Sequence, residues 1–367
     1  MRSPRTASVA GMIVGLLAIT ASGVVAQEGA TITVAQDGSG DHDTISAAVE
    51  AATAGDTVLI APGTYNELTI ILDEDLRLVG DGDRSEIVVS PSAELVAEAA
   101  DSRLSQEPPP AVIRVTAGAP SIERLTLQGG GRSLVVEGGS PTFTDVVFEG
   151  GDVELILGEP VFRESLIGVY FAVRGASPTV EDSELTGHAS VDGPGRTIIR
   201  RSTLHDGTSA SANATGVYED NHFVGVQLAV DTGSDMLVRG NLVEGVDAIP
   251  AIEVRDPGSS AEIIGNTIRD SVIGITVDSD EPGSSVVGNT IEGVRIGIHV
   301  DSDSPVPVAD NAIDSTTAGI VLGGDGPEIS GNTICGEGTA FDTVSYTHLT
   351  LPTNTNACGW GGGGGAG

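Results

Sequence analysis

The sequence predicts an all-β solenoid in which short parallel strands stack in successive coils, and three observations support this prediction. The tetrapeptide Gly-Asn-Thr-Ile recurs at 265–268, 288–291 and 331–334, with a looser copy at 311–313. Three of these copies are followed by Gly-Ile-x-(Val or Leu), at 274–277, 297–300 and 319–322. Glycine is abundant, at 51 residues, while aromatic residues make up only 3% of the chain. Such short, regular repeats indicate stacked coils joined by tight turns.

The repeat can be aligned backwards through eleven coils on the column that contains the Asn. Its members are Asn332, Asn311, Asn289, Asn266, Asn241, Asn221, Ser202, Ser183, Ser165, Val146 and Leu125. An apolar or aromatic side chain stands two residues after each member and three residues before it. Strand alternation adds a third inward face, so we expect three parallel sheets and about 12–14 coils. A leucine-rich-repeat horseshoe is disfavoured because no helical half-repeat separates the copies.

The Asn column itself is interpreted as structural. Asn tolerates a left-handed backbone in a turn, and its amide can bond the equivalent residue of the next coil. We therefore expect a ladder of turn residues and no ligand at these positions. Tyr218 falls in an inward column and is expected in the core.

One amphipathic helix is predicted before the first coils. Apolar residues at 45, 48, 49 and 52 have helical spacing, Thr44 or Asp43 can cap the start, and Gly55 stands at the end. Because the open end of a solenoid exposes unpaired strands, this helix is expected to act as an N-terminal cap. Short strands are expected around it, at 32–34, 56–60, 68–72 and 76–80.

Two motifs in this region carry a family resemblance. Val34-Ala35-Gln36-Asp37-Gly38-Ser39-Gly40 with Thr44-Ile45, and Pro62-Gly63-Thr64-Tyr65-x-Glu67, resemble the N-terminal module of right-handed parallel β-helix proteins of the pectin-lyase-like superfamily. Within this superfamily, the two motifs are most similar to those of pectin methylesterases. The resemblance implies a right-handed parallel β-helix. The esterases' Gln-Asp-Thr-Leu-like, Gly-x-x-Asp-Phe-like and Gly-Arg-Pro-Trp-like motifs are absent, so pectin esterase activity is the least favoured reading.

Charge and the first residues bear on the cellular setting. The formal net charge is −35, and all 17 basic residues are Arg, which argues against nucleic-acid binding. Residues 1–26 have the charged start, apolar middle and small-residue end of a secretory signal peptide. We therefore expect a secreted protein, extracellular or in the cell envelope, that does not span a membrane after signal cleavage. A monomer is expected.

Candidate catalytic residues gather on the middle coils. His205, His222, Arg201 and Asp220 fall within about two coils, and His188 and Asp206 lie nearby. A polysaccharide lyase or epimerase needs a base, a cation that stabilises developing charge, and an acid. These residue types could supply them. Alternatively, they are ordinary polar residues of outward rows.

A second candidate site consists of carboxylates at matching offsets in adjacent coils: Asp278, Asp280, Asp301 and Asp303. Carboxylates stacked one coil apart repel each other unless a cation lies between them, and Ca²⁺ prefers such oxygen ligands. The alternative is a hydrated acidic turn. The loose spacing of the His residues disfavours zinc.

Two segments depart from the repeat. Residues 91–110 form an acidic insertion with one or two helical turns, which either borders a binding face or is a tolerated surface loop. Residues 344–367 fit no coil and are typical of translated sequencing-adapter read-through, so we predict that they are not native. The β-helix is thus expected over residues 27–343.

Two classes of function remain open. The favoured one is a non-catalytic secreted β-helix that binds a polysaccharide or cell-surface glycan, or serves as an extracellular scaffold. The other is a lyase or epimerase acting on acidic, uronate-containing polysaccharide. The absence of a complete catalytic motif favours the first class.

Overall fold

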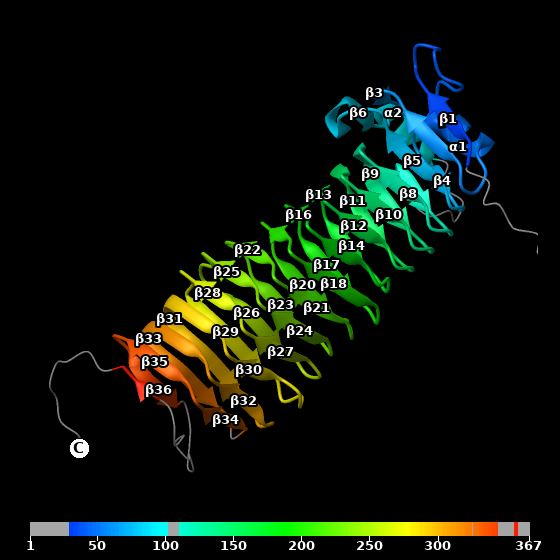
Figure 1. Cartoon of the computed structure of the whole chain (residues 1–367). Helices are drawn as coiled ribbons and strands as arrows, with labels where there is room; N and C mark the ends of the chain where they lie inside the picture. The colour runs from blue at the N-terminus through cyan, green and yellow to red at the C-terminus, as the bar shows by residue number, and fades with distance from the viewer. Residues whose placement is uncertain (1–28, 102–109, 325, 344–355, 359–367) are drawn as a thin grey trace, which may run out of the picture.

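The chain is a long parallel β-helix in the computed structural model, with the N-terminal coils at one end and the C-terminal coils at the other (Figure 1). The structure describes residues 29–101, 110–324, 326–343 and 356–358. All strand pairings are parallel, and about 13 coils stack along the axis. At about 4.8 Å per coil, the stack is on the order of 60 Å long. The predicted fold class is confirmed.

From β2 onward, the coils contribute strands to three faces, which we call sheets A, B and C. Sheet A contains β1 (Thr31–Val34), β2 (Thr57–Ile60), β5 (Arg77–Gly80), β8 (Ser121–Glu123), β10 (Thr142–Thr144), β12 (Val161–Arg163), β15 (Thr179–Glu181), β18 (Arg196–Arg200), β21 (Thr215–Glu219), β24 (Asp235–Arg239), β27 (Ser260–Ile264), β30 (Ser285–Val287), β32 (Val306–Ala309) and β34 (Pro327–Ser330).

Sheet B follows sheet A in the coils from β2 onward, whereas α1 follows β1. It contains β3 (Gly63–Tyr65), β6 (Ile87–Val89), β13 (Leu166–Ile167), β16 (Glu184–Leu185), β19 (Thr203–Leu204), β22 (His222–Val224), β25 (Leu242–Glu244), β28 (Thr267–Arg269), β35 (Thr333–Gly336), β37 (Asn356–Ala357) and the first halves of β9 (Thr126–Val136), β11 (Val147–Leu155), β31 (Thr290–Asp301) and β33 (Ala312–Gly323).

Sheet C completes the coil. It contains β4 (Ile70–Leu72), β7 (Ile113–Val115), β14 (Phe171–Val173), β17 (Ala189–Asp192), β20 (Thr208–Ser211), β23 (Leu228–Val230), β26 (Pro250–Arg255), β29 (Ile273–Asp278), β36 (Thr339–Thr343) and the second halves of β9, β11, β31 and β33.

The core is the apolar interior between the three sheets. The column two residues after the ladder position is buried in all eleven coils, from Leu127 to Ile334. The column three residues before it is buried from Ile122 to Val308, and only Ile329 is half-exposed. Four of the six Phe residues pack against one another in the second and third of these coils, including Phe143 stacked on Phe162 at 4.9 Å.

A hydrogen-bonded ladder runs through the turn between sheets A and B. The Asn266 amide nitrogen donates to Oδ1 of Asn289 (3.0 Å) and to the carbonyl of Val238 (2.9 Å). Its own Oδ1 accepts the backbone and side-chain N–H groups of Asn241, both at 2.9 Å. The pattern repeats from Asn221 to Asn332, all of which are buried. The predicted ladder is confirmed.

The left-handed residue of this turn is not the Asn, so that part of the prediction is wrong. Positive φ occurs one residue earlier in all eleven coils: Arg124, Asp145, Glu164, Asp182, Arg201, Asp220, Gly240, Gly265, Gly288, Asp310 and Gly331. The chain bends from sheet A to sheet B at this position. The bend directs the following side chain inward, where it joins the ladder. Where the residue is not Gly, the conformation carries a steric cost that the ladder must offset.

Serine continues the ladder where the coils are shorter. The Ser183 backbone N–H donates to Oγ of Ser202 (3.2 Å), and the Ser202 N–H donates to Oδ1 of Asn221 (3.0 Å). Consecutive members are separated by as few as 18 residues, at Ser165–Ser183, and by as many as 25, at Asn241–Asn266. The turn is therefore the same in long and short coils.

The predicted helix α1 (Ile45–Ala51) lies at the N-terminal end of the stack (Figure 1). Thr44 caps it, accepting from the Ala47 N–H at 3.3 Å, while Ile45 and Ala48 are fully buried. The Pro62–Glu67 motif explains its placement. Glu67 accepts the Ile45 and Ser46 N–H groups at 2.6 and 2.7 Å. The Tyr65 hydroxyl donates to the Ala61 carbonyl. This motif therefore anchors the cap to the first coil.

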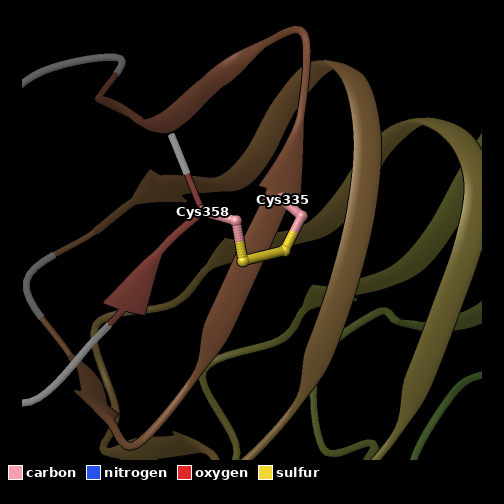
Figure 2. Close-up of a disulfide and its surroundings, with 2 residues drawn as sticks. All are labelled: Cys335 and Cys358. Atoms are coloured by element: carbon pink, nitrogen blue, oxygen red, sulfur yellow. A yellow bond between two sulfur atoms is a disulfide. The ribbon is translucent and has the colours of Figure 1, made fainter. Parts of the chain in front are cut away.

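Two further segments complete the chain. Within the acidic insertion, α2 (Ala93–Asp101) confirms the predicted helical turns, whereas 102–109 lies outside the described residues. A 3-10 turn, η1 (Arg84–Glu86), precedes β6. At the other end β37 pairs with β35, and Cys358 forms a disulfide with Cys335 (Figure 2). Most of 344–367 is not described, so its non-native origin stays a prediction.

A cluster of charges stabilises the outer face of sheet A. The Glu181 carboxylate, only 7% exposed, contacts Arg163, Arg200 and Arg201. Burial alone would raise the pKa of Glu181, but the hydrogen bonds from these guanidinium groups outweigh it and lower the pKa below its ordinary value of 4.5. Removing one charged side chain from such a cluster leaves the charges of its partners without compensation.

We predict that Asn266→Ala lowers stability by about 2–4 kcal/mol, because it takes one acceptor from the buried Asn241 amide and one donor from the Val238 carbonyl. The measurement is the urea midpoint followed by circular dichroism. Asn266→Ser, which imitates the shorter coils, should recover part of the loss. Thr267→Ala, on the outward side of the next position, serves as control and should change stability by less than about 0.5 kcal/mol. Equal effects at both positions would contradict a structural role for the ladder.

A second prediction concerns Glu181 and pH. Because its folded-state pKa is depressed, its contribution to stability is present above pH 4.5 and is lost as pH falls through the folded-state value. Glu181→Gln should therefore destabilise the protein by about 2–3 kcal/mol at neutral pH and show a flatter decline of melting temperature on acidification. Glu262→Gln, at an exposed position on the same sheet, is the control. A parallel shift at every pH would argue against the ion cluster.

Candidate functional site

The two predicted catalytic histidines lie on the outer face of sheet B. His222, on β22, bonds Glu244 of the next coil, with Nε2 and Oε1 2.7 Å apart. His205 follows β19 and contacts Glu184 of the preceding coil, with Nε2 and Oε1 3.1 Å apart. The register places His222 beside Thr203, two residues before His205 in that coil. The histidines therefore occupy different rows, each with its own carboxylate.

Arg201 and Asp220 occupy the left-handed turn column between sheets A and B. Arg201 binds Asp182 with Nε and Nη2, both at 2.8 Å, and also reaches Glu181. These contacts raise the pKa of Arg201 above its ordinary value and lower the pKa of Asp182. Asp220 is exposed one coil further on. Arg201 is thus committed to ion pairs. The catalytic assignment of the four residues stays a prediction.

Tyr218 confirms the expectation of a core position. Its side chain is fully buried, its hydroxyl is 2.9 Å from Thr208 Oγ1, and burial raises the pKa of Tyr218 to about 12. It cannot reach a ligand on the surface.

The four predicted cation ligands lie at the turn that follows sheet C. Asp278, Asp280 and Asp301 line an open hollow of about 480 Å³ together with Glu281 and Arg255. The Asp303 backbone N–H donates to Oδ1 of Asp280 at 2.6 Å. Within the described ranges, no three His, Cys, Asp or Glu side chains converge closely enough to hold a metal ion. The calcium site stays a prediction.

A different hollow lies on the outer side of sheet C, where the chain turns from sheet B. We call it the sheet C hollow. Its volume is about 480 Å³, and its lining comes from the coils that contain β20, β23 and β26. His188 borders one end, where its ring stacks on the exposed ring of Tyr170, with centroids 6.0 Å apart and planes 9° apart. Ile249, 46% exposed, borders the other end.

The hollow exists because neighbouring coils differ in length at this turn. Residues 205–207 and 225–227 make short connections from sheet B to sheet C, whereas 245–249 make a longer one that carries Ile249 outward. The floor between the two ends consists of small residues, Gly207, Ser209 and Ala229. Three coils span on the order of 14 Å, which gives the length of the hollow along the axis.

Polar side chains beside the floor are held in a defined network. Gln227 Nε2 donates to the Pro250 carbonyl (3.0 Å) and to Oε2 of Glu253 (2.9 Å). Arg255 binds both carboxylate oxygens of Asp231, from Nε at 2.6 Å and from Nη2 at 3.2 Å. The Ser209 hydroxyl lies 3.4 Å from His188 Nε2, and His188 Nδ1 lies 3.9 Å from Asp206. The result is a firm polar border around a small-residue floor.

Of these residues, the sequence singled out only His188 and Asp206, as neighbours of the predicted catalytic group. Tyr170, Gln227, Ile249 and Arg255 were missed because the first three lie in the turn from sheet B to sheet C, which varies in length, and Arg255 ends the sheet C strand that follows the longest such turn. One signal was available in the sequence: the 25-residue separation of Asn241 and Asn266 marks the coil with the long connection.

Comparison with solved structures identifies proteins that share this fold. No curated protein matches the chain significantly. The A-module of mannuronan C-5 epimerase AlgE6 from Azotobacter vinelandii is 14% identical, with a TM-score of 0.52 over 86% of this chain and 96% of the module. Tailspike protein 3 of bacteriophage CBA120 is 13% identical, with a TM-score of 0.59 over 90% of this chain and 62% of the tailspike. At such identities, these similarities establish the fold alone.

A family model described as "right handed beta helix region" matches residues 113–356, about two thirds of the chain. This match agrees with the resemblance seen in the N-terminal motifs and extends it over the coils that carry the ladder and the sheet C hollow. The chain therefore belongs to the right-handed β-helix family.

Proposed function

We propose that this protein is a secreted β-helix that binds an extended glycan in the sheet C hollow. The observation that carries the proposal is the hollow itself: a floor of small residues between His188, on whose ring the exposed Tyr170 stacks, and the exposed Ile249. Sugar rings present apolar C–H faces and a rim of hydroxyl groups. An aromatic ring and an aliphatic side chain can pack on such faces, and the surrounding polar groups can bond the hydroxyls.

Two further points support a polysaccharide ligand. The coils stack along a straight axis, so the outer rows of sheet C present equivalent positions at regular intervals, which suits a polymer better than a small molecule. One fold relative, the mannuronan C-5 epimerase module, is named for a polysaccharide. Secretion rests on the signal-like residues 1–26, which lie outside the described residues. Within the described ranges, no helix has the length and apolar character needed to cross a membrane.

The test is binding to a panel of soluble polysaccharides, measured by isothermal titration calorimetry with wild-type protein and two variants. Tyr170→Ala should weaken binding about threefold to tenfold, because it removes a stacking surface from the end of the hollow. Ser209→Trp should fill the floor and weaken binding more than tenfold. Thr290→Trp, on the outer face of sheet B, is the matched control and should leave affinity unchanged. Equal binding by all variants would place the glycan elsewhere.

A lyase or epimerase is the second candidate, favoured by His188 next to Asp206 at the border of the hollow. A histidine paired with a carboxylate can act as a base. Incubation with pectate and alginate, with and without calcium, followed by absorbance of unsaturated product and by NMR of the sugar epimers, tests it. Loss of activity in His188→Ala would support the sheet C hollow as the active site. Loss in His205→Ala or His222→Ala would instead support the sheet B residues. No turnover with any substrate would exclude this candidate.

A further inference from the structure

The ionic groups that border the sheet C hollow are mostly acidic. Asp206, Asp231 and Asp247 line it, against a single guanidinium, Arg255. Arg255 is already engaged, since it binds both oxygens of Asp231 and also contacts Glu253 at 3.3 Å. These two acids are largely buried, with 11% and 17% of their side chains exposed. Arg255 is therefore more than balanced by its own carboxylate partners, and His188, the other basic group at the hollow, lies beside Asp206.

The hydrogen-bonding groups at the hollow are also mainly acceptors. Both N–H bonds of the Gln227 amide are used, one by the Pro250 carbonyl and one by Glu253, which leaves its carbonyl oxygen as the free group. Asp206 is 56% exposed, accepts the Gly207 N–H at 2.7 Å and lies 3.9 Å from His188 Nδ1, so part of its acceptor capacity is open to solvent. Asp247 is exposed in the connection that carries Ile249.

A ligand of this hollow must therefore supply donors and positive charge. A uronate carboxylate supplies only further acceptors and a negative charge, and it would approach a chain whose net charge is −35. A protonated amino group supplies three donors and a positive charge, which matches an exposed carboxylate. The acidic border and the stacking surface occur in the same hollow, within reach of one bound oligosaccharide.

We propose that the glycan bound in the sheet C hollow carries protonated amino sugars, whose ammonium groups pair with Asp206 and Asp247 while the sugar rings pack on Tyr170 and Ile249. This inference rests on the proposed glycan-binding function and specifies its ligand. It departs from the uronate-containing substrate considered from the sequence.

The experiment compares three soluble oligosaccharides of matched length by titration calorimetry: oligoglucosamine, its fully N-acetylated form and an oligouronate. Measurements are made at low and high salt below neutral pH, where the amines are charged. At low salt the amino form should bind about threefold to tenfold more tightly than the acetylated form, and the oligouronate most weakly. High salt should remove most of this advantage.

The variants Asp206→Asn and Asp247→Asn keep an acceptor oxygen at each position and remove only the charge. Together they should abolish the preference, so that the amino and acetylated forms bind the double variant with equal affinity. Asp314→Asn, at an exposed carboxylate on sheet B, is the matched control and should retain the preference. Melting temperatures of all variants should match wild type, because these side chains are exposed.

The outcomes separate the two proposals. Binding of the acetylated or uronate oligosaccharide as tightly as the amino form overturns the charge assignment, while the sheet C hollow remains a glycan site. A preference for the amino form that survives both substitutions also overturns it, since the carboxylates would then play no part. Failure of all three oligosaccharides, and of the wider polysaccharide panel, overturns the glycan-binding function itself.

Discussion

The ladder between sheets A and B is the interaction on which the rest of the molecule depends. The side-chain amide of each buried Asn from Asn221 to Asn311 donates to the equivalent Asn of the next coil and to a backbone carbonyl of the preceding coil, as Asn266 does to Asn289 and Val238. Its backbone N–H also donates to the Asn of the next coil. Buried amides that lack partners are costly, so any shift in register would break several bonds at once. The ladder therefore fixes how one coil sits on the next. The apolar columns on either side supply most of the burial, but apolar side chains alone tolerate slippage.

With that turn fixed, variation is confined to the other two turns of each coil. The connection from sheet B to sheet C ranges from the short 205–207 to the longer 245–249. A long connection beside short ones leaves a hollow with a raised border. The sheet C hollow arises in this way, next to a floor that small residues leave open. The acidic turns with Asp278 and Asp301 lie at the third corner, after sheet C. Arg255 lines both hollows, so the two features are contiguous on one side of the stack.

Much of the fold could be read from the sequence because its determinants are local and periodic. The Asn266 column, the apolar columns around it and the cap at Ile45 all follow from residue type and spacing. The left-handed position was misassigned by one residue. Gly or Asp, which favour this conformation, occupy eight of the eleven positions, but Arg124, Glu164 and Arg201 break the pattern, while the column of Asn beside it is itself compatible with a left-handed backbone. The candidate site was harder to predict. Tyr170 and His188 meet only because parallel register brings them into one row, and Ile249 emerges only because its coil is longer than its neighbours.

The constancy of the A–B turn also bears on how such a chain can evolve. Eleven successive coils end the sheet A strand with a residue in the left-handed conformation followed by a ladder residue, whether the next ladder residue comes 18 or 25 residues later. A coil bounded by two such turns is an interchangeable unit. Duplication or loss of one unit preserves every bond at the junction and changes only the length of the stack. The neighbouring faces then diverge independently, so a lineage can acquire, move or lose a surface hollow without disturbing the interior that supports it.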